Sequence, residues 1–141
     1  MDKNISIKIF IVLAWFVSIY HLILGIIGTF APQGTVISIA QSVFGVAIEA
    51  TPQFFVLSKF IAALFIMLGI TMAFVAKNPQ KHGHLAWAVI VYFAIRIFNR
   101  ISHFSLLNEA FGTTMQRNIM TVIPILIIAI GLIICMPRGK S

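Results

Sequence analysis

The chain has 141 residues, of which 60% are hydrophobic and only 9% are charged. A mean hydropathy of +1.06 lies far outside the range of soluble globular domains. The net charge of +7 does not indicate nucleic-acid binding, because the cations lie mainly at the ends of apolar runs, where the positive-inside bias places them. We therefore expect a single all-α membrane domain over residues 1–141, an integral four-helix bundle with no nucleic-acid partner.

The first apolar run covers about residues 5–30. It is longer than the apolar core of a signal peptide, about 7–15 residues, so we expect it to be retained as a span. Ser18, His21, Gly25 and Gly28 share one helical face, with the small-residue spacing that lets membrane helices approach closely. Tyr20 and His21 lie in the half of this span farther from the N-terminus. Taken alone, His21 is more simply explained as a packed histidine than as a functional one.

The next segment, about residues 31–53, is bounded by the turn-forming sequences APQG and TPQ. It is too short and too polar to span, and its polar residues recur at helical spacing. We expect a short amphipathic helix on the outer side of the membrane, with its polar face toward Lys59 and Arg100. Simple interfacial anchoring and a lid over a site remain equal alternatives. The polar stripe consists of Ser38, Gln41, Ser42, Gly45 and Glu49.

Three more apolar runs predict spans at about residues 53–75, 85–106 and 119–136. His82 and His84 share a loop without cysteine or carboxylate, so no metal site is expected there. Cys135 is the only cysteine, which excludes an internal disulfide. Pro124 is expected near the first turn of the last span, where a missing N–H costs little. No phosphate loop or carboxylate pair is present, and no cofactor is expected.

Polar residues interrupt the third predicted span in the stretch YFAIRIFNRISH, residues 92–103. At about 100° per residue, these polar positions fall within an arc of about 100° on one helix face. Two guanidiniums in a lipid-spanning helix are costly and usually mark a pathway or a site. The candidate site residues on this helix are Tyr92, Arg96, Asn99, Arg100 and His103.

The distribution of Lys and Arg predicts the orientation of the chain. The first and third loops hold only Arg117, whereas six cations lie at the N-terminus, in the second loop and at the C-terminus. Both termini are therefore expected in the cytoplasm, in a multi-pass cell-membrane protein. The six cations are Lys3, Lys8, Lys77, Lys81, Arg138 and Lys140.

This orientation places the polar residues of three spans toward the outer leaflet. Lys59 and Arg100 lie about 9 Å below the outer surface, shallow enough to extend to the headgroups, and Arg96 lies about 15 Å deep. The only carboxylates are Asp2, Glu49 and Glu109, and none lies within a span. Glu49 and Glu109 are the candidate partners for one of the shallower cations. Arg96 needs water, carbonyls, a partner or an anionic ligand, and a ligand cavity and a structural network are equally consistent with this pattern.

The chain resembles the DoxX-like superfamily of small four-span membrane proteins, in the branch with a domain of unknown function. The resemblance covers most of the chain. It rests on the segments HLILGIIGTFAP and LSKFIAALFIMLGITMAF, on the polar third span with His103, and on Asn118 before an apolar last span. It implies a membrane bundle, in some members an accessory subunit near quinone-linked oxidoreduction, and no established catalytic residue.

We expect a cationic outer-leaflet cavity that binds an amphiphilic anion, a lipid headgroup or a quinone-like molecule, or an accessory subunit of a membrane complex. The expected ligand contacts are those of Arg96, Asn99, Arg100, His103, Lys59, Tyr92, His21, Tyr20 and Glu49. One alternative is a small membrane enzyme acting on a lipophilic substrate, with His103 or His21 as acid–base catalyst, as in the four-span glutathione-transferase class. Another is a polar face that only contacts a partner membrane protein or a second copy of the chain.

Overall fold

A computed structural model describes residues 3–137 of the chain. Over this range the chain is helical and has no strand. Four helices are long and apolar enough to cross a membrane, at Asn4–Phe30, Pro52–Lys77, Pro79–Ser102 and Met115–Cys135. The prediction of an all-α chain with four potential spans is confirmed. Three charged residues named above, Asp2, Arg138 and Lys140, lie outside the described residues.

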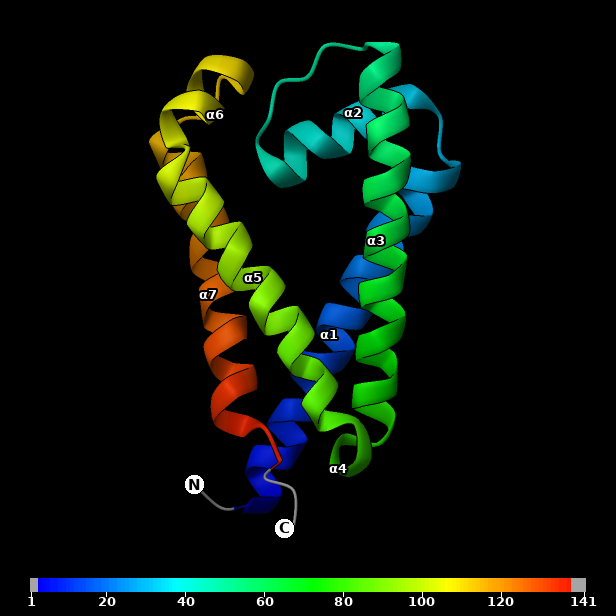
Figure 1. Ribbon diagram of the computed structural model, residues 1–141, viewed down its shortest axis with the longest axis vertical. Coiled ribbons are helices and arrows are strands. Elements are labelled where there is room, and N and C mark those ends of the chain that lie inside the picture. The colour runs from blue at the N-terminus through cyan, green and yellow to red at the C-terminus, as the bar shows by residue number, and fades with distance from the viewer. Residues whose placement is uncertain (1–2, 138–141) are drawn as a thin grey trace.

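The four long helices form two pairs (Figure 1). One pair is α1 with α3, and the other is α5 with α7. The pairs meet at the end that holds both termini and diverge toward the end that holds α2 and α6. The elements in chain order are α1 (Lys3–Phe30), α2 (Gln33–Ile39), the π-helical turn η1 (Ala40–Phe44), α3 (Pro52–Lys77), α4 (Pro79–His82), the 3-10 turn η2 (Gly83–Leu85), α5 (Ala86–Ser102), α6 (Phe104–Phe111) and α7 (Met115–Cys135).

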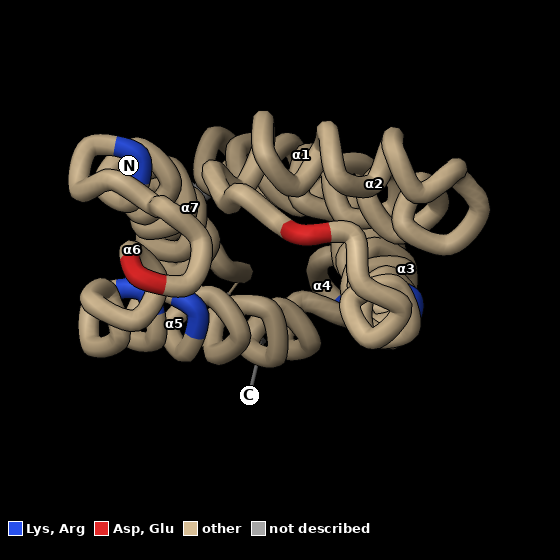
Figure 2. Tube along the Cα trace, turned by 90° about the horizontal axis from the view of Figure 1, so that it is seen from above, with Lys and Arg blue, Asp and Glu red and all other residues tan. Residues whose placement is uncertain are grey.

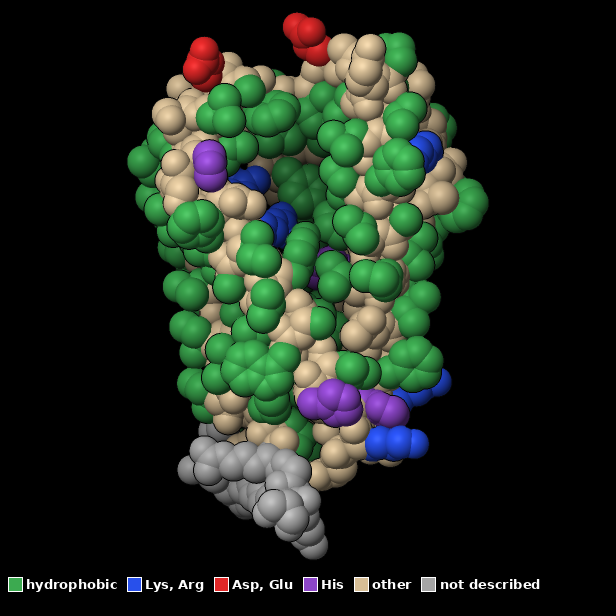
Figure 3. Space-filling model, in the orientation of Figure 1, with side chains coloured by type: hydrophobic (Ala, Val, Ile, Leu, Met, Phe, Trp, Pro, Cys, Tyr) green, Lys and Arg blue, Asp and Glu red, His purple; other side chains and the backbone are tan. Residues whose placement is uncertain are grey.

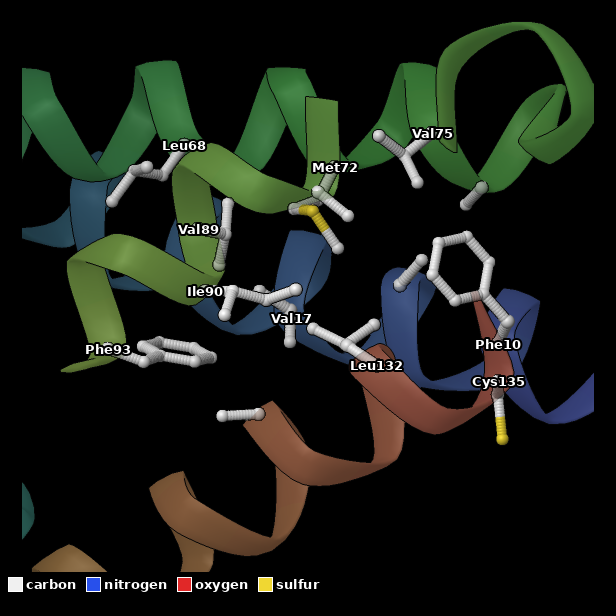
Figure 4. Packing of buried hydrophobic residues seen from close by; sticks show 14 of the residues in the cluster. Phe10, Val17, Leu68, Met72, Val75, Val89, Ile90, Phe93, Leu132 and Cys135 are labelled. Atoms are coloured by element: carbon white, nitrogen blue, oxygen red, sulfur yellow. The ribbon is translucent and has the colours of Figure 1, made fainter. Parts of the chain in front are cut away.

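The packed core occupies the closed end, where the two pairs meet. All four long helices contribute to it (Figure 4), and its central side chains are fully buried. Phe10 lies near the start of α1, Val75 near the end of α3, and Leu132 near the end of α7. This packing holds the pairs together at one end only, so the space between them at the other end depends on different contacts.

Small residues bring α1 and α3 together. A Cβ atom added to Gly25 would lie 2.6 Å from the Ile66 side chain and 2.9 Å from the Ala62 carbonyl oxygen. A Cβ added to Gly69 would lie 2.6 Å from the Leu22 side chain. The Ser18 hydroxyl donates a hydrogen bond of 2.8 Å to the Gly69 carbonyl across the same interface. The close approach therefore uses the small-residue face of α1, as membrane helices commonly do.

Two predicted features of the later spans differ in the structure. The third span is interrupted at His103, where α5 ends and the short helix α6 begins. Apolar residues continue past this position, so hydropathy gives no sign of the break. The last helix begins at Met115, and Pro124 therefore lies in its interior. The expectation that Pro124 occupies the first turn is wrong, because the polar residues before Ile119 also adopt helical geometry.

The segment between α1 and α3 folds back between the two pairs at the diverging end (Figure 1). Within the described residues, Lys59 and Arg100 make their hydrogen bonds to other groups than the polar side chains of this segment, namely to main-chain carbonyls and Asn118. Ser38, Gln41 and Glu49 are exposed, whereas Ala40 is buried. Gly45 ends the π-helical turn with a φ of 67°, and the chain from there to Glu49 is not helical. Helical spacing therefore stops before Glu49, so only the first part of the predicted stripe, Ser38, Gln41 and Ser42, lies on helical backbone, where all three are exposed.

Candidate functional site

A cavity of about 640 Å³ lies between the diverging helix pairs. Residues of α1, α5, α7 and the η1 region line it, and Figure 3 shows the hollow at this end of the molecule, with basic side chains inside it. The walls are mostly aromatic and aliphatic, including Phe16, Phe93 and Ile128. A limited set of polar residues completes the lining: Tyr20, His21, Ser42, Arg96, Thr114, Gln116, Arg117 and Thr121.

Arg96 supplies a positive charge to this cavity without an acidic partner among the described residues. Its guanidinium carbon lies 5.2 Å from the centre of the Phe44 ring, in a cation–π arrangement, and it interacts electrostatically with Tyr20. The two carboxylates that the structure describes, Glu49 before α3 and Glu109 on α6, are exposed. Seen from above, the acidic positions lie on separate parts of the chain (Figure 2), and their side chains lie at the rim in Figure 3. Arg96 is thus half-buried and charge-unbalanced, and its guanidinium has donors suited to an anion.

His21 also lines the cavity, and only 1% of its surface is exposed. Its Nδ1 lies 2.8 Å from the Val17 carbonyl oxygen. Because a carbonyl can only accept, Nδ1 carries the proton and donates, which leaves Nε2 of the neutral ring as an acceptor. Nε2 is buried and has no partner among the described residues. Buried polar atoms without a partner are rare in proteins, and this one accepts a donor from any molecule that reaches it.

Arg100, one turn from Arg96, is held in place by hydrogen bonds to other parts of the protein. Its guanidinium donates to the Asn118 side-chain oxygen at 3.2 Å and to the Phe44 carbonyl at 2.9 Å. In return, the Asn118 amide donates to the Arg100 carbonyl at 3.2 Å. Both residues are buried, with 8% and 4% of their surfaces exposed. This reciprocal pair joins α5 to α7, so Arg100 stabilises the wall of the cavity and does not line it.

The residues that follow α2 are bound to the α5–α7 side by several hydrogen bonds. Besides Arg100, Arg117 donates to the Gln41 carbonyl at 2.8 Å, and Thr113 donates to the Gly45 carbonyl at 3.1 Å. The Ala47 amide donates to the Phe111 carbonyl at 2.9 Å. We call residues 40–47 the bridging segment, because it connects the two helix pairs across the open end of the cavity.

The remaining predicted site residues lie outside the cavity. Asn99 and His103 are exposed, and Tyr92 is half-buried with its ring 6.1 Å from that of His21. The buried face of α5 includes Phe93 and Arg100. The predicted polar stripe is rotated away from the centre of this face. One edge of the stripe therefore points into the protein, and the other edge is exposed. Glu49 is exposed beyond the bridging segment. His82 and His84 belong to no cluster of three metal-ligating side chains within the described residues.

Lys59 lies against the end of α1. Its Nζ donates to the Gly28 carbonyl at 3.1 Å and to the Thr29 carbonyl at 2.6 Å. These carbonyls belong to the last turn of α1, where carbonyl groups have no N–H partner within the helix and carry partial negative charge. Lys59 therefore caps α1 from the neighbouring helix and has a structural role in this arrangement.

We expect the substitution Lys59→Met to lower the free energy of unfolding by about 0.5–1 kcal/mol, because the carbonyls lose a charged donor at a helix C-terminus. Denaturation with sodium dodecyl sulfate from mild detergent measures this change. Lys81→Met, at an exposed position outside these contacts, serves as the control. Equal stability of the two variants would contradict the capping role.

Sequence reasoning missed Arg117 and Phe44 as parts of the site. Arg117 was counted only as a loop charge, although it lies in the first turn of α7 and lines the cavity. The one feature of the sequence that indicated a role for Arg117 was its position directly before Asn118, which belongs to the resemblance to the DoxX-like superfamily. Phe44 offered no signal, because an aromatic residue in an apolar segment is indistinguishable from an ordinary packing residue.

No protein-family model, no curated protein and no solved structure matches this chain. The resemblance to the DoxX-like superfamily therefore stays a prediction.

Proposed function

We propose that this protein is a multi-pass cell-membrane protein that binds an amphiphilic anion in the cavity between its helix pairs. The observation that carries the proposal is Arg96, a half-buried guanidinium that lines the cavity and has no carboxylate partner in the described part of the chain. In this proposal the four long helices form a membrane bundle with both termini in the cytoplasm, and the bridging segment covers the outer end.

The free energy of placing Arg96 in this cavity favours a bound anionic ligand over a purely structural role for the side chain. A cation–π contact with Phe44 contributes about 0.5–2 kcal/mol, depending on how far the pair is removed from water. A charge at membrane depth costs more than this, about 2.5–3.5 kcal/mol on insertion scales. A carboxylate, phosphate or sulfonate group offsets the difference through charge-assisted and bidentate hydrogen bonds.

The rest of the lining supports an amphiphilic ligand. A volume of about 640 Å³ lies within the range of small-molecule sites, about 300–1,000 Å³. Its mostly apolar walls suit the hydrophobic part of the ligand, while Arg96, Arg117 and His21 suit its polar group. The unpaired His21 Nε2 adds a preference for an anion that also carries a hydroxyl or N–H donor.

The test measures binding of n-dodecyl phosphate to the purified protein by native mass spectrometry from mild detergent. Arg96→Leu is expected to weaken binding about tenfold or more, which corresponds to about 1.4 kcal/mol. Arg96→Lys is expected to weaken it less, because lysine keeps the charge but loses the bidentate geometry. Circular dichroism and thermal denaturation check that each variant folds.

Lys59→Met is the matched control, since it removes another cation of a spanning helix that lies outside the cavity. It is expected to bind n-dodecyl phosphate as the wild type does. Unchanged binding by Arg96→Leu would refute the proposal. So would unfolding of Arg96→Leu when the wild-type protein binds no phosphate, because Arg96 would then be purely structural.

A further inference from the structure

A second cavity, of about 230 Å³, lies on the other side of the bridging segment from the first. Residues of α1, α2 and α3 line it together with Ala40, Phe44 and Val46 of the bridging segment. Ser58 is the only one of its lining residues with a polar side chain, and its hydroxyl is bonded to the Phe55 carbonyl within α3 at 2.8 Å. The lining offers no group that would hold a polar ligand, but it suits a hydrocarbon chain.

Two aromatic rings separate this apolar cavity from the cationic one. Phe44 and Phe65 both line the second cavity and are stacked, with ring centroids 6.3 Å apart and an interplanar angle of 18°. Two polar residues of the first cavity also lie against these rings. Arg96 lies over the Phe44 ring, and the His21 and Phe65 rings are close to perpendicular, with centroids 5.5 Å apart.

We propose that the two cavities are the two halves of one site, in which a single-chain amphiphile places its anionic head at Arg96 and its tail in the second cavity. This inference rests on the proposed function and specifies its ligand class. Because the two cavities share no lining residue, the tail reaches the second cavity only when the Phe44 and Phe65 rings move apart, and the separated rings then pack against the hydrocarbon chain. The head then remains beside the Arg96 guanidinium and the free Nε2 of His21.

Filling the second cavity provides the test. Ser58→Phe places a ring where the tail would lie, and the lost hydroxyl served only a bond within its own helix. We expect it to weaken binding of n-dodecyl phosphate about tenfold and to leave binding of n-butyl phosphate unchanged. The short chain does not need the second cavity, so the two probes separate a blocked tail from a damaged head site. Binding is measured by native mass spectrometry in one detergent, so that micelle partitioning is the same for every variant.

Thr71→Phe is the matched control. Thr71 also lies on α3 and also bonds a carbonyl of its own helix, that of Met67 at 2.8 Å, but it lines neither cavity. It should bind both phosphates as the wild type does. Val36→Phe fills the same cavity from α2 and serves as a second variant if Ser58→Phe does not fold.

The outcomes distinguish this inference from the proposed function. If the filling variants bind n-dodecyl phosphate normally while Arg96→Leu binds neither probe, the two-cavity site is refuted and the anion site stands. If the filling variants lose both probes equally, the tail assignment is refuted as well. If neither probe depends on Arg96, the proposed function fails and this inference fails with it.

Discussion

Replacing Gly25 with valine should force α1 away from α3 and lower the free energy of unfolding by about 3 kcal/mol, the upper part of the usual range for overpacking. The first added atom alone would lie 2.8 Å from the Ile66 backbone nitrogen and 2.9 Å from the Ala62 carbonyl oxygen. Backbone atoms cannot turn aside as a flexible side chain does. The clash should therefore outweigh the gain of less than about 1 kcal/mol that a helix obtains when glycine is replaced by valine.

Gly34→Val provides the comparison, because no atom lies within 4 Å of a Cβ at that position. It is expected to change the free energy of unfolding by less than about 0.5 kcal/mol, as surface substitutions usually do. Denaturation with sodium dodecyl sulfate measures both variants. Similar stability of Gly25→Val and Gly34→Val would mean that α1 and α3 are farther apart than the structure has them.

The substitution Asn118→Leu should destabilise the protein by about 1–3 kcal/mol, the cost of leaving a buried donor without its acceptor. Arg100 keeps only its bond to the Phe44 carbonyl in this variant, although it stays charged and buried. Asn99→Leu removes a neighbouring asparagine whose side chain is exposed. That control should be neutral or slightly stabilising in detergent.

The double variant Arg100→Leu, Asn118→Leu sharpens this test. Removing both polar partners of a buried pair is often nearly neutral, whereas removing one is costly. The double variant should therefore be more stable than Asn118→Leu, although recovery is partial because the Phe44 carbonyl also loses its donor. A double variant less stable than the single one would show that the reciprocal pair is not the main contact of these residues.

Hydropathy predicted the four long helices, because a run of about 20 apolar residues has few other stable conformations in a membrane. The face of α1 that meets α3 was also readable, since glycines at helical spacing have a direct steric meaning. The rotation of α5 was not readable. Helical periodicity places Arg96 and Arg100 on the same face and cannot distinguish their roles. The position of α7 determines that Asn118 bonds Arg100 and not Arg96.

The bridging segment was the least predictable part of the candidate site. Its π-helical turn and the positive φ of Gly45 depend on contacts with residues far along the chain. A Cβ at Gly45 would lie 2.8 Å from the Arg117 side chain, so the turn and α7 are fitted to each other. Periodicity within the segment cannot contain this information, which explains why the predicted polar stripe extended to Glu49.

The bridging segment is held by main-chain groups of its own, the carbonyls of Gln41, Phe44 and Gly45 and the amide of Ala47. Every amino acid carries a main-chain carbonyl, whereas the donors to these three carbonyls are the particular side chains of Arg100, Thr113 and Arg117. Substitutions should therefore be tolerated better within the bridging segment than at the side chains that donate to it. Substitutions at positions such as Ser42 and Val43 should leave these hydrogen bonds in place. The residues that determine the position of the bridging segment lie more than fifty positions later in the chain.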